Sequence, residues 1–313
     1  MEKNAKIYVA GSTGLVGGAI VRRLQNEGYT NIITRTRHEL DLTDKQAVNL
    51  FYSTIRPEYV IVSAAKVGGI KANMSYPAEF LYENLEIQNN LIWWAHLSGV
   101  TKLLFLGSSC IYPRECPQPM KEEYLMTGKL EPTNEWYAIA KIAGMRLCEY
   151  ISRQFGKNFI SCMPTNVYGP GDHFDTERWH VIPAMITRMY AAKLAGDATF
   201  GVWGTGSARR EFLYVDDLAE VVLYLLDHYI GTDFLNIGTG EDVSITELTH
   251  MLMDIMDYHP EIIYDTSKPD GMPRKLLDVT RLAETGWQYR TSLIEWLKNT
   301  YEYYKQQILN HNM

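Results

Sequence analysis

The stretch AGSTGLVG, residues 10–17, joins the apolar segment KIYVA (6–10) to a run of helix-forming residues. In such a turn Gly11 permits the tight bend, Gly14 lets the backbone approach a pyrophosphate, and Gly17 lets a helix pack closely on a sheet. The N-terminus of the following helix would present N–H groups to the phosphate charge. The spacing is G-x-x-G-x-x-G rather than G-x-G-x-x-G, and glycines alone can mark an ordinary helix start. Because the stretch follows the first strand of an alternating series, we predict a dinucleotide-binding turn.

Strand and helix signals alternate through the first half of the chain. Short segments rich in β-branched residues are separated by longer segments with helical periodicity. The expected strands are 6–11, 31–34, 59–65, 102–107 and 159–164, and the expected helices are 15–27, 45–55, 77–97 and 136–155. This alternation is typical of βαβ units, so we predict an α/β fold with a Rossmann-like, doubly wound parallel sheet.

The regular alternation ends after Pro164. Residues 165–210 are rich in Gly, Pro and aromatic residues around one expected helix at 183–194, and a strand at 233–238 and a helix from Ile245 follow. We expect two domains: a dinucleotide-binding Rossmann domain from 1–164 and about 211–239, and a smaller α/β substrate-binding domain from 165–210 and 240–313. Open α/β sheets bind ligands at the carboxyl ends of their strands, so the smaller domain should lie over those ends.

Composition indicates an ordinary soluble globular protein. The 313 residues are 46% hydrophobic and 21% charged, with a formal net charge of -7. This acidic balance gives no reason to expect nucleic acid as a partner, although an anionic substrate remains compatible with local arginines. We expect no secretory signal and no membrane span. The four cysteines (110, 116, 148 and 162) show no C-x-x-C pair, so we expect a reducing cytoplasm.

The end of the second expected strand reads TRTRHELDL, residues 34–42. An NAD site would present an acid there for the ribose 2′-hydroxyl, whereas Arg35 and Arg37 suit a 2′-phosphate. We therefore predict NADPH as the cofactor. The alternative is that both arginines are solvated surface residues and that the nearby Asp41 serves the adenosine.

Two further motifs carry chemistry. In GSSCIYP, residues 107–113, Ser108 follows a buried strand and could polarise a substrate carbonyl. Cys110 stands two residues later, which on an extended backbone places it on the same side. In YAIAK, Tyr137 and Lys141 share one face of an expected helix, where the ammonium could lower the phenol pKa and hold a ribose hydroxyl. A core tyrosine beside a surface lysine is the alternative.

These motifs together resemble the extended short-chain dehydrogenase/reductases that act on nucleotide sugars. The resemblance runs from residue 7 to about 287 and rests on GSTGLVG, GSSCIYP, EPTNEWYAIAKIAG, MPTNVYGP, HVIPAM, REFLYVDDLA and KPDGMPRKLLDVTRL. It is most similar to the bifunctional members that epimerise C3 and C5 of GDP-4-keto-6-deoxy-D-mannose and reduce C4 with NADPH to give GDP-L-fucose. The related 4,6-dehydratases differ, because they carry an Asp-Glu pair where this chain has Ser109 and Cys110.

The resemblance implies roles for particular residues. It implies Cys110 as the base and His180 as the acid of epimerisation, with Ser108, Tyr137 and Lys141 serving C4 and no metal needed. The implied cofactor-binding residues are Gly11, Ser12, Thr13, Gly14, Leu15, Val16, Gly17, Arg35, Arg37, Asp41, Leu42, Ala64, Ala65, Tyr137, Lys141, Pro164, Thr165, Asn166, Val167 and His180. The implied substrate-binding residues are Ser108, Ser109, Cys110, Asn166, Arg188, Trp203, Arg210 and Asp270. It also implies a homodimer through the helices at 77–97 and 135–155.

Several alternatives stay open. A basic residue in the glycine loop, present in some family members, is Thr13 here, so NADPH preference would depend on Arg35 and Arg37. The arginines and Trp203 could be structural, and Trp93 and Trp94 are expected in the core. We expect the cysteines other than Cys110 to have no role in catalysis. The chain could instead be another nucleotide-sugar epimerase or reductase, or a non-catalytic NADP sensor.

Overall fold

The computed structural model describes residues 1–67, 75–174, 180–268, 270–289 and 291–311. Its centre is a six-stranded parallel sheet in the order β10-β5-β4-β3-β1-β2. The strands are β1 (Ile7–Ala10), β2 (Ile32–Thr34), β3 (Tyr59–Val62), β4 (Lys102–Leu106), β5 (Asn158–Pro164) and β10 (Leu235–Ile237). The predicted doubly wound parallel sheet is confirmed. The strand order reverses between β1 and β3, which makes this the topological switch point.

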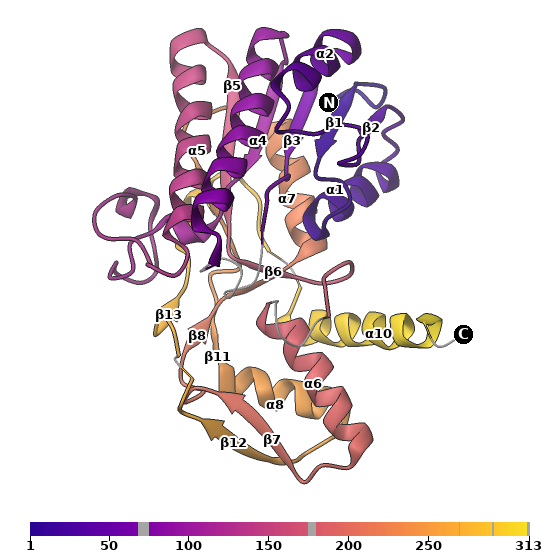
Figure 1. Cartoon of the computed structure of the whole chain (residues 1–313), viewed down its shortest axis with the longest axis vertical. Coiled ribbons are helices and arrows are strands. Elements are labelled where there is room, and N and C mark those ends of the chain that lie inside the picture. Colours follow the sequence, from indigo (N-terminus) through magenta and orange to yellow (C-terminus); the bar gives the residue numbers. More distant parts are fainter. Residues whose placement is uncertain (68–74, 175–179, 269, 290, 312–313) are drawn as a thin grey trace.

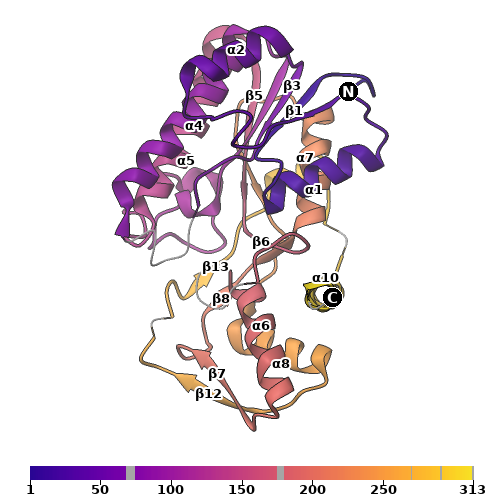
Figure 2. The ribbon, with the colours of Figure 1, turned by 45° about the vertical axis from the view of Figure 1, so that its right-hand side comes forward.

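Helices cover both faces of the sheet, which explains why its strands are almost continuously apolar (Figure 2). One face carries α1 (Leu15–Asn26) and α7 (Val215–His228), and the other carries α2 (Lys45–Ile55), α4 (Pro77–Leu97) and α5 (Glu135–Phe155). Helix ends follow local chemistry. Asp44 caps α2 by accepting from the N–H groups of Gln46 and Ala47, and Gly156 ends α5 in the left-handed conformation.

A buried lysine fixes strand β4, which leads into the Ser108 motif. Lys102 is 4% exposed, and its Nζ donates to the carbonyls of Leu225 at 2.7 Å, Leu226 at 2.8 Å and Tyr229 at 2.7 Å. These carbonyls belong to the C-terminal end of α7, where a cation also complements the helix dipole. The lysine therefore ties the central strand to the helix that covers it.

A second, smaller region extends from the carboxyl end of β5, below the sheet in Figure 1. Its helices are α6 (Val181–Ala195), α8 (Ile245–Met256) and α10 (Leu293–His311). Its strand pairs are β6 (Asn166–Tyr168) with β9 (Phe212–Tyr214), β7 (Thr199–Trp203) with β12 (Glu261–Asp265), and β8 (Arg209–Arg210) with both β11 (Val243–Ser244) and β13 (Arg274–Lys275). A separate core that includes Ile186, Phe200 and Leu252 holds this region together.

The chain passes between these regions more than once near its C-terminal end. After β13, the short helix α9 (Thr280–Glu284) places Leu282 in the core shared with α1 and α7, and Trp287 joins the same core. Helix α10 then returns to the smaller region, where Trp296 stacks on Tyr214 with ring centroids 3.7 Å apart.

Two expectations about single side chains are settled by the structure. The expectation that Trp93 lies in the core is wrong, because its side chain is 40% exposed on α4, whereas Trp94 is partly buried. Cys148 and Cys162 are fully buried as expected, and all four cysteines are free thiols. None of the described helices is both long enough and apolar enough to cross a membrane.

Candidate active site

The glycine turn lies at the switch point of the sheet. Gly11 has φ +83°, and a Cβ there would stand 2.7 Å from the backbone N of Ala64, which follows β3. A Cβ on Gly17 would stand 2.1 Å from the carbonyl oxygen of Gly11, so only glycine lets α1 begin this close to the turn. A Cβ on Gly14 would meet only that same oxygen, at 3.5 Å, so the protein's own packing does not demand its small size.

These features fit a bound dinucleotide. Helix α1 starts without a side-chain cap and has no acidic residue in its first turn. Its first N–H groups and its dipole are therefore available to an anion. Gly14 and Thr13 are exposed at the turn, while Ser12, Leu15 and Val16 are half-buried beside it. The residues present thus fit a pyrophosphate above the carboxyl edge of the sheet.

The predicted 2′-phosphate residues follow β2. Arg35 is half-buried, donates from Nη1 to the carbonyl of Thr34 at 2.6 Å and lies 5.6 Å above the ring of Phe51. Arg37 is exposed. Asp41 accepts from both the backbone N–H and the hydroxyl of Thr43, which lowers the pKa of its carboxyl. Asp41 is therefore engaged in its own loop, beside the half-buried Leu42.

The Ser108 motif forms a turn at the end of β4. Ser108 has an extended backbone, but Ser109–Ile111 form a 3₁₀ turn (η1), and the Ser108 Oγ caps it by accepting the Cys110 N–H at 3.3 Å. The expectation of an extended backbone through Cys110 is therefore wrong. The turn forms because a serine hydroxyl readily satisfies a free N–H at such a start. The Ser108 side chain also bonds to the Cys110 thiol, so the turn holds the serine and the cysteine together.

Tyr137 and Lys141 lie on the first turns of α5, next to η1. Lys141 is 4% exposed, its Nζ lies 5.6 Å from the Tyr137 ring, and it donates to the carbonyl of Leu106 at 2.8 Å. Burial lowers the pKa of Lys141 to about 8. The expectation that Lys141 lowers the pKa of Tyr137 is not met: burial, and then the charge of Cys110, raises the pKa of that phenol. Desolvation dominates, and the Lys141 ammonium donates to the Leu106 carbonyl of β4.

Cys110 is 8% exposed and interacts electrostatically with both Tyr137 and Lys141. Burial raises the pKa of its thiol, while Lys275 and the hydrogen bond to Ser108 pull it back down. Burial lowers the pKa of Lys275 in turn, and Cys110 opposes that shift. Lys275 was not singled out from the sequence. It lies in the motif KPDGMPRKLLDVTRL, but the spacing within this motif does not indicate a contact with a thiol some 160 residues earlier.

The remaining expected cofactor contacts lie at neighbouring strand ends. Ala64 and Ala65 follow β3 and are half-buried. Pro164 ends β5 and Val167 lies in β6. Thr165 joins the two strands, and its N–H donates to the carbonyl of Ile237 at 2.9 Å. Asn166 donates from Nδ2 to the carbonyl of Glu211 at 2.8 Å. The carboxyl edges of β3 and β5 thus flank the Ser108 turn.

The expected substrate residues form two groups in the smaller region. In the first, the guanidinium of Arg188 lies 5.7 Å from the ring of Trp203 and bonds to the Gly201 carbonyl. Trp203 is 56% exposed, which excludes a core role. In the second, Arg210 donates to the Asp270 carbonyl at 3.1 Å, while the Asp270 carboxylate accepts from Thr205.

His180 stands apart from the other predicted catalytic groups. It immediately precedes α6 and its side chain is 56% exposed. Its Nδ1 lies 3.4 Å from Oδ2 of Asp172. No hydrogen bond or ion pair among the described residues joins His180 to Cys110 or Tyr137.

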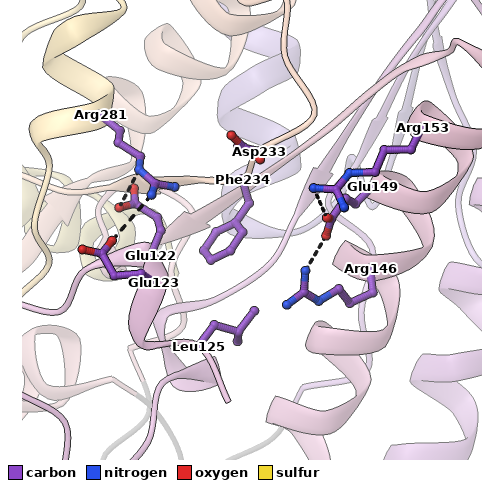
Figure 3. A pocket seen from close by; sticks show the side chains of 9 residues that line it. All are labelled: Glu122, Glu123, Leu125, Arg146, Glu149, Arg153, Asp233, Phe234 and Arg281. Atoms are coloured by element: carbon purple, nitrogen blue, oxygen red, sulfur yellow. Dashed lines mark hydrogen bonds and ion pairs between the residues drawn. The ribbon is translucent and has the colours of Figure 1, made fainter. Parts of the chain in front are cut away.

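A polar hollow of about 200 Å³ lies elsewhere, between η2 (Glu122–Tyr124), α5 and the segment before β10 (Figure 3). It contains none of the predicted site residues, and each of its arginines already contacts a carboxylate. Its ion pairs join Arg281 to Glu122 and Glu123, and Glu149 to Arg146 and Arg153. We assign it no ligand.

A parallel sheet with a glycine turn at its switch point, and a serine, tyrosine and lysine meeting at the end of β4, define a dinucleotide-dependent enzyme of the extended short-chain dehydrogenase/reductase class. A family model described as "NAD dependent epimerase/dehydratase family" matches residues 7–238. The chain belongs to this family.

Individual relatives cover nearly the whole chain. GDP-L-fucose synthase 1 of Arabidopsis thaliana is 52% identical over 309 residues, which is 99% of this chain and 96% of the relative. A solved GDP-L-fucose synthetase from Naegleria fowleri bound to NADP has a TM-score of 0.91 at 29% identity and covers 99% and 95% of the two chains. A solved GDP-mannoheptose C4 reductase from Campylobacter jejuni with NADP bound has a TM-score of 0.90 at 39% identity and covers 97% and 99%.

Proposed function

We propose that this chain epimerises C3 and C5 of GDP-4-keto-6-deoxy-D-mannose and then reduces C4 with NADPH to give GDP-L-fucose. The observation that carries the proposal is the meeting of Ser108, Cys110, Tyr137 and Lys141 at the end of β4. The extent of the likeness to the Arabidopsis relative supports the choice of substrate. The likeness to solved structures with NADP bound supports the choice of cofactor.

Epimerisation needs a base on one face of the sugar and an acid on the other, because the C4 ketone acidifies the C–H bonds at C3 and C5. We assign the base to Cys110, whose thiolate takes the proton, and the acid to His180, which returns one. The O–H groups of Ser108 and Tyr137 donate hydrogen bonds to the C4 oxygen as negative charge develops there. The Cys110 N–H donates to the Ser108 Oγ and so holds this hydroxyl in place at the end of β4.

Reduction uses the same groups on the C4 oxygen. Bound NADPH supplies the hydride for C4. Tyr137 gives its proton to the oxygen, and its raised pKa keeps it protonated at neutral pH until charge forms there. Lys141, with one N–H on the Leu106 carbonyl, keeps further donors for a ribose hydroxyl. We assign the glycine turn to the pyrophosphate and Arg35 and Arg37 to the 2′-phosphate.

The smaller region is assigned to the GDP moiety. Arginine forks bind pyrophosphate oxygens in pairs, which suits Arg188 and Arg210. The exposed ring of Trp203 offers a face for stacking. We assign Asn166 and Ser109 to the sugar, and Asp270 holds the loop that carries Thr205.

Incubation of the protein with GDP-4-keto-6-deoxy-D-mannose and NADPH in deuterated buffer tests the proposal. Product NMR should show GDP-L-fucose with deuterium at C3 and C5, because each proton lost is replaced from solvent. The matched reactions with UDP- and dTDP-linked 4-keto sugars should be slow. Failure to consume NADPH with the GDP-linked sugar would refute the proposal.

A second candidate is reduction of another GDP-linked 4-keto sugar without inversion. The likeness to the Campylobacter GDP-mannoheptose C4 reductase favours it. The same experiment separates the two, since a simple reductase would consume NADPH without placing deuterium at C3 or C5.

We further propose a cytoplasmic homodimer. Helices α4 and α5 pack side by side (Figure 1). Both helices carry exposed apolar side chains. These are Tyr82, Trp93 and Leu97 of α4 and Ile139, Tyr150 and Phe155 of α5, which we call the α4/α5 face. Apolar patches of this kind mark protein interfaces. Four free thiols support a reducing compartment.

A further inference from the structure

His180 has a carboxylate partner that the proposed mechanism does not yet use. Its ring is largely exposed, so packing alone does not fix its orientation. The described residues supply one ion-pair partner, Asp172, whose Oδ2 lies 3.4 Å from the His180 Nδ1. The side chain of Asp172 is only 3% exposed, which is unusual for a carboxylate without a charged or hydrogen-bonded partner.

The structure holds Asp172 in place independently of His180. It ends a tight turn in which its N–H donates to the Gly169 carbonyl at 3.1 Å, and Gly169 and Gly171 have φ of +140° and +92°. Its Oδ1 accepts the N–H of His173 at 2.8 Å. One oxygen of the carboxylate is therefore engaged locally, and the other faces the imidazole.

The segment after this turn is anchored to α6, the helix that follows His180. Phe174 packs on Tyr304 of α10 with ring centroids 4.9 Å apart. Its carbonyl accepts the hydroxyl of Thr187 from α6 at 3.3 Å. Asp172 and His180 thus come from two segments that are each attached to the core of the smaller region.

We propose that Asp172 is the positioning residue for His180 in the epimerisation. Its Oδ2 accepts the Nδ1–H of the imidazole, which fixes the tautomer and the ring plane and leaves Nε2 as the atom that faces the sugar. The role of this pair in epimerisation rests on the proposed function. The hydrogen bond itself does not depend on which sugar is bound.

Each inversion breaks one C–H bond and forms another on the opposite face of the same carbon. The C–H bond breaks as the Cys110 thiolate takes the proton, and the electron pair moves to the C4 oxygen as an enolate. The pair then returns to carbon as the His180 Nε2–H proton forms the new C–H bond on the opposite face. Neutral His180 keeps its Nδ1–H on Asp172, and solvent later removes the thiol proton and reprotonates Nε2.

The first test needs no substrate. In protein labelled with ¹⁵N-histidine at a pH where imidazole is neutral, NMR should find His180 as the Nδ1–H tautomer. The Asp172→Asn variant should move it toward Nε2–H. A His180 signal that reads Nε2–H in the wild type, or is unchanged in the variant, would overturn the proposal, whatever the substrate proves to be.

The second test uses a double-mutant cycle with the keto sugar and NADPH. Asp172→Asn should slow inversion about 10- to 100-fold, the value of one charge-assisted hydrogen bond, and leave C4 reduction of an already inverted sugar within twofold. In a His180→Asn background the same change should have no further effect, because both act through one group. Additive losses would show that Asp172 merely supports the fold.

Controls separate the possible failures. Asp197→Asn removes an exposed acid just beyond the far end of α6 and should change neither the tautomer nor inversion. Asp172→Ser, which keeps a hydrogen-bond acceptor without the charge, replaces Asp172→Asn if that variant does not fold. Wild-type protein that holds the Nδ1–H tautomer yet never inverts the sugar would contradict the proposed function and leave the hydrogen bond established.

Discussion

Arg35 and Arg37 differ in burial, and this separates their expected contributions to cofactor choice. Replacing both with alanine should weaken NADPH binding by several kcal/mol at most, since each charge-assisted hydrogen bond contributes about 1.5–3 kcal/mol. NADH, which lacks the 2′-phosphate, should be nearly unaffected. Arg35→Ala alone should cost more than Arg37→Ala, because Arg35 is half-buried and already held by the Thr34 carbonyl.

Fluorescence titration of each cofactor measures these losses. Lys45→Ala, which removes an exposed cation from the first turn of α2, is the matched control and should change neither affinity. Equal losses for NADPH and NADH would contradict the assignment of these arginines.

One substitution can test the role of the Cys110 thiol separately from the residues that serve C4. Cys110→Ser keeps the side-chain volume but exchanges a thiol that can ionise for a hydroxyl that hardly does. Solvent deuterium uptake at C3 and C5 should fall by at least about 100-fold, the scale of general base catalysis. NADPH should still be oxidised slowly, giving a 6-deoxy sugar that is not inverted.

Cys116→Ser makes the same change in a half-buried loop thiol and should leave uptake unchanged. Wild-type uptake in Cys110→Ser would mean that Cys110 only packs beneath Ser108.

The residues that sequence reasoning did not find are those whose partners lie on a different element. The glycine turn, Ser108, Tyr137 and Lys141 were recognisable because each sits at a fixed spacing on one element. Lys275 interacts with Cys110 only through the tertiary fold, and Asp172 and His180 lie eight residues apart without a shared helix or strand to align them. The turn at Ser109–Ile111 was also missed, because a hydroxyl cap overrode the extended conformation.

At the scale of elements, long helices were predictable and short strands were not. The expected helices at 45–55 and 77–97 coincide with α2 and α4, because each has enough turns for its apolar periodicity to show. Strands β8, β11 and β13 have two residues each and exist only because distant segments pair. The secondary structure of the second half of the chain was therefore less predictable from the sequence than that of the first half.

Glu211 joins several of these short elements. Its side chain is fully buried, and its carboxylate accepts the N–H groups of Thr239 at 2.7 Å, Gly240 at 2.8 Å and Leu277 at 2.9 Å. Burial raises its pKa to about 7 in spite of these bonds. The folded protein therefore binds the Glu211 proton more tightly than the unfolded chain does.

The free energy of unfolding should therefore fall as the pH rises. The contribution of this proton to stability is complete below the unfolded pKa and is lost as pH rises through about 7. Its scale is about 3 kcal/mol, from 1.36 kcal/mol per pKa unit. Urea unfolding between pH 5 and pH 8 should show this slope in the wild type. Glu211→Gln should flatten it.

Glu115→Gln, at a side chain that is 90% exposed, should keep the wild-type slope. Parallel pH profiles for the wild type and Glu211→Gln would contradict the assignment to Glu211.

At the scale of the whole molecule, the α4/α5 face predicts the assembly state. Light scattering at micromolar concentration should give twice the 35.9 kDa of one chain. The double variant Trp93→Arg, Tyr150→Arg should give a single chain, because a two-fold interface brings like charges together and buries them. Ile230→Arg, at an 88% exposed position outside this face, should remain a dimer. A wild-type protein of single-chain mass would refute the homodimer.

The bonds around Glu211 also bear on how such an enzyme can acquire a new substrate. Thr165, Glu211, Gly240 and Leu277 mark four places where the chain passes between the sheet and the smaller region, and the other three each hydrogen-bond to Glu211 there. A chimera that grafted the smaller region from a relative would need every one of these junctions to match at once. Replacing the whole smaller region is therefore unfavourable as a way to change substrate specificity in this fold. Point changes on surfaces such as the one around Trp203 and Arg188 leave the junctions intact and are the accessible route.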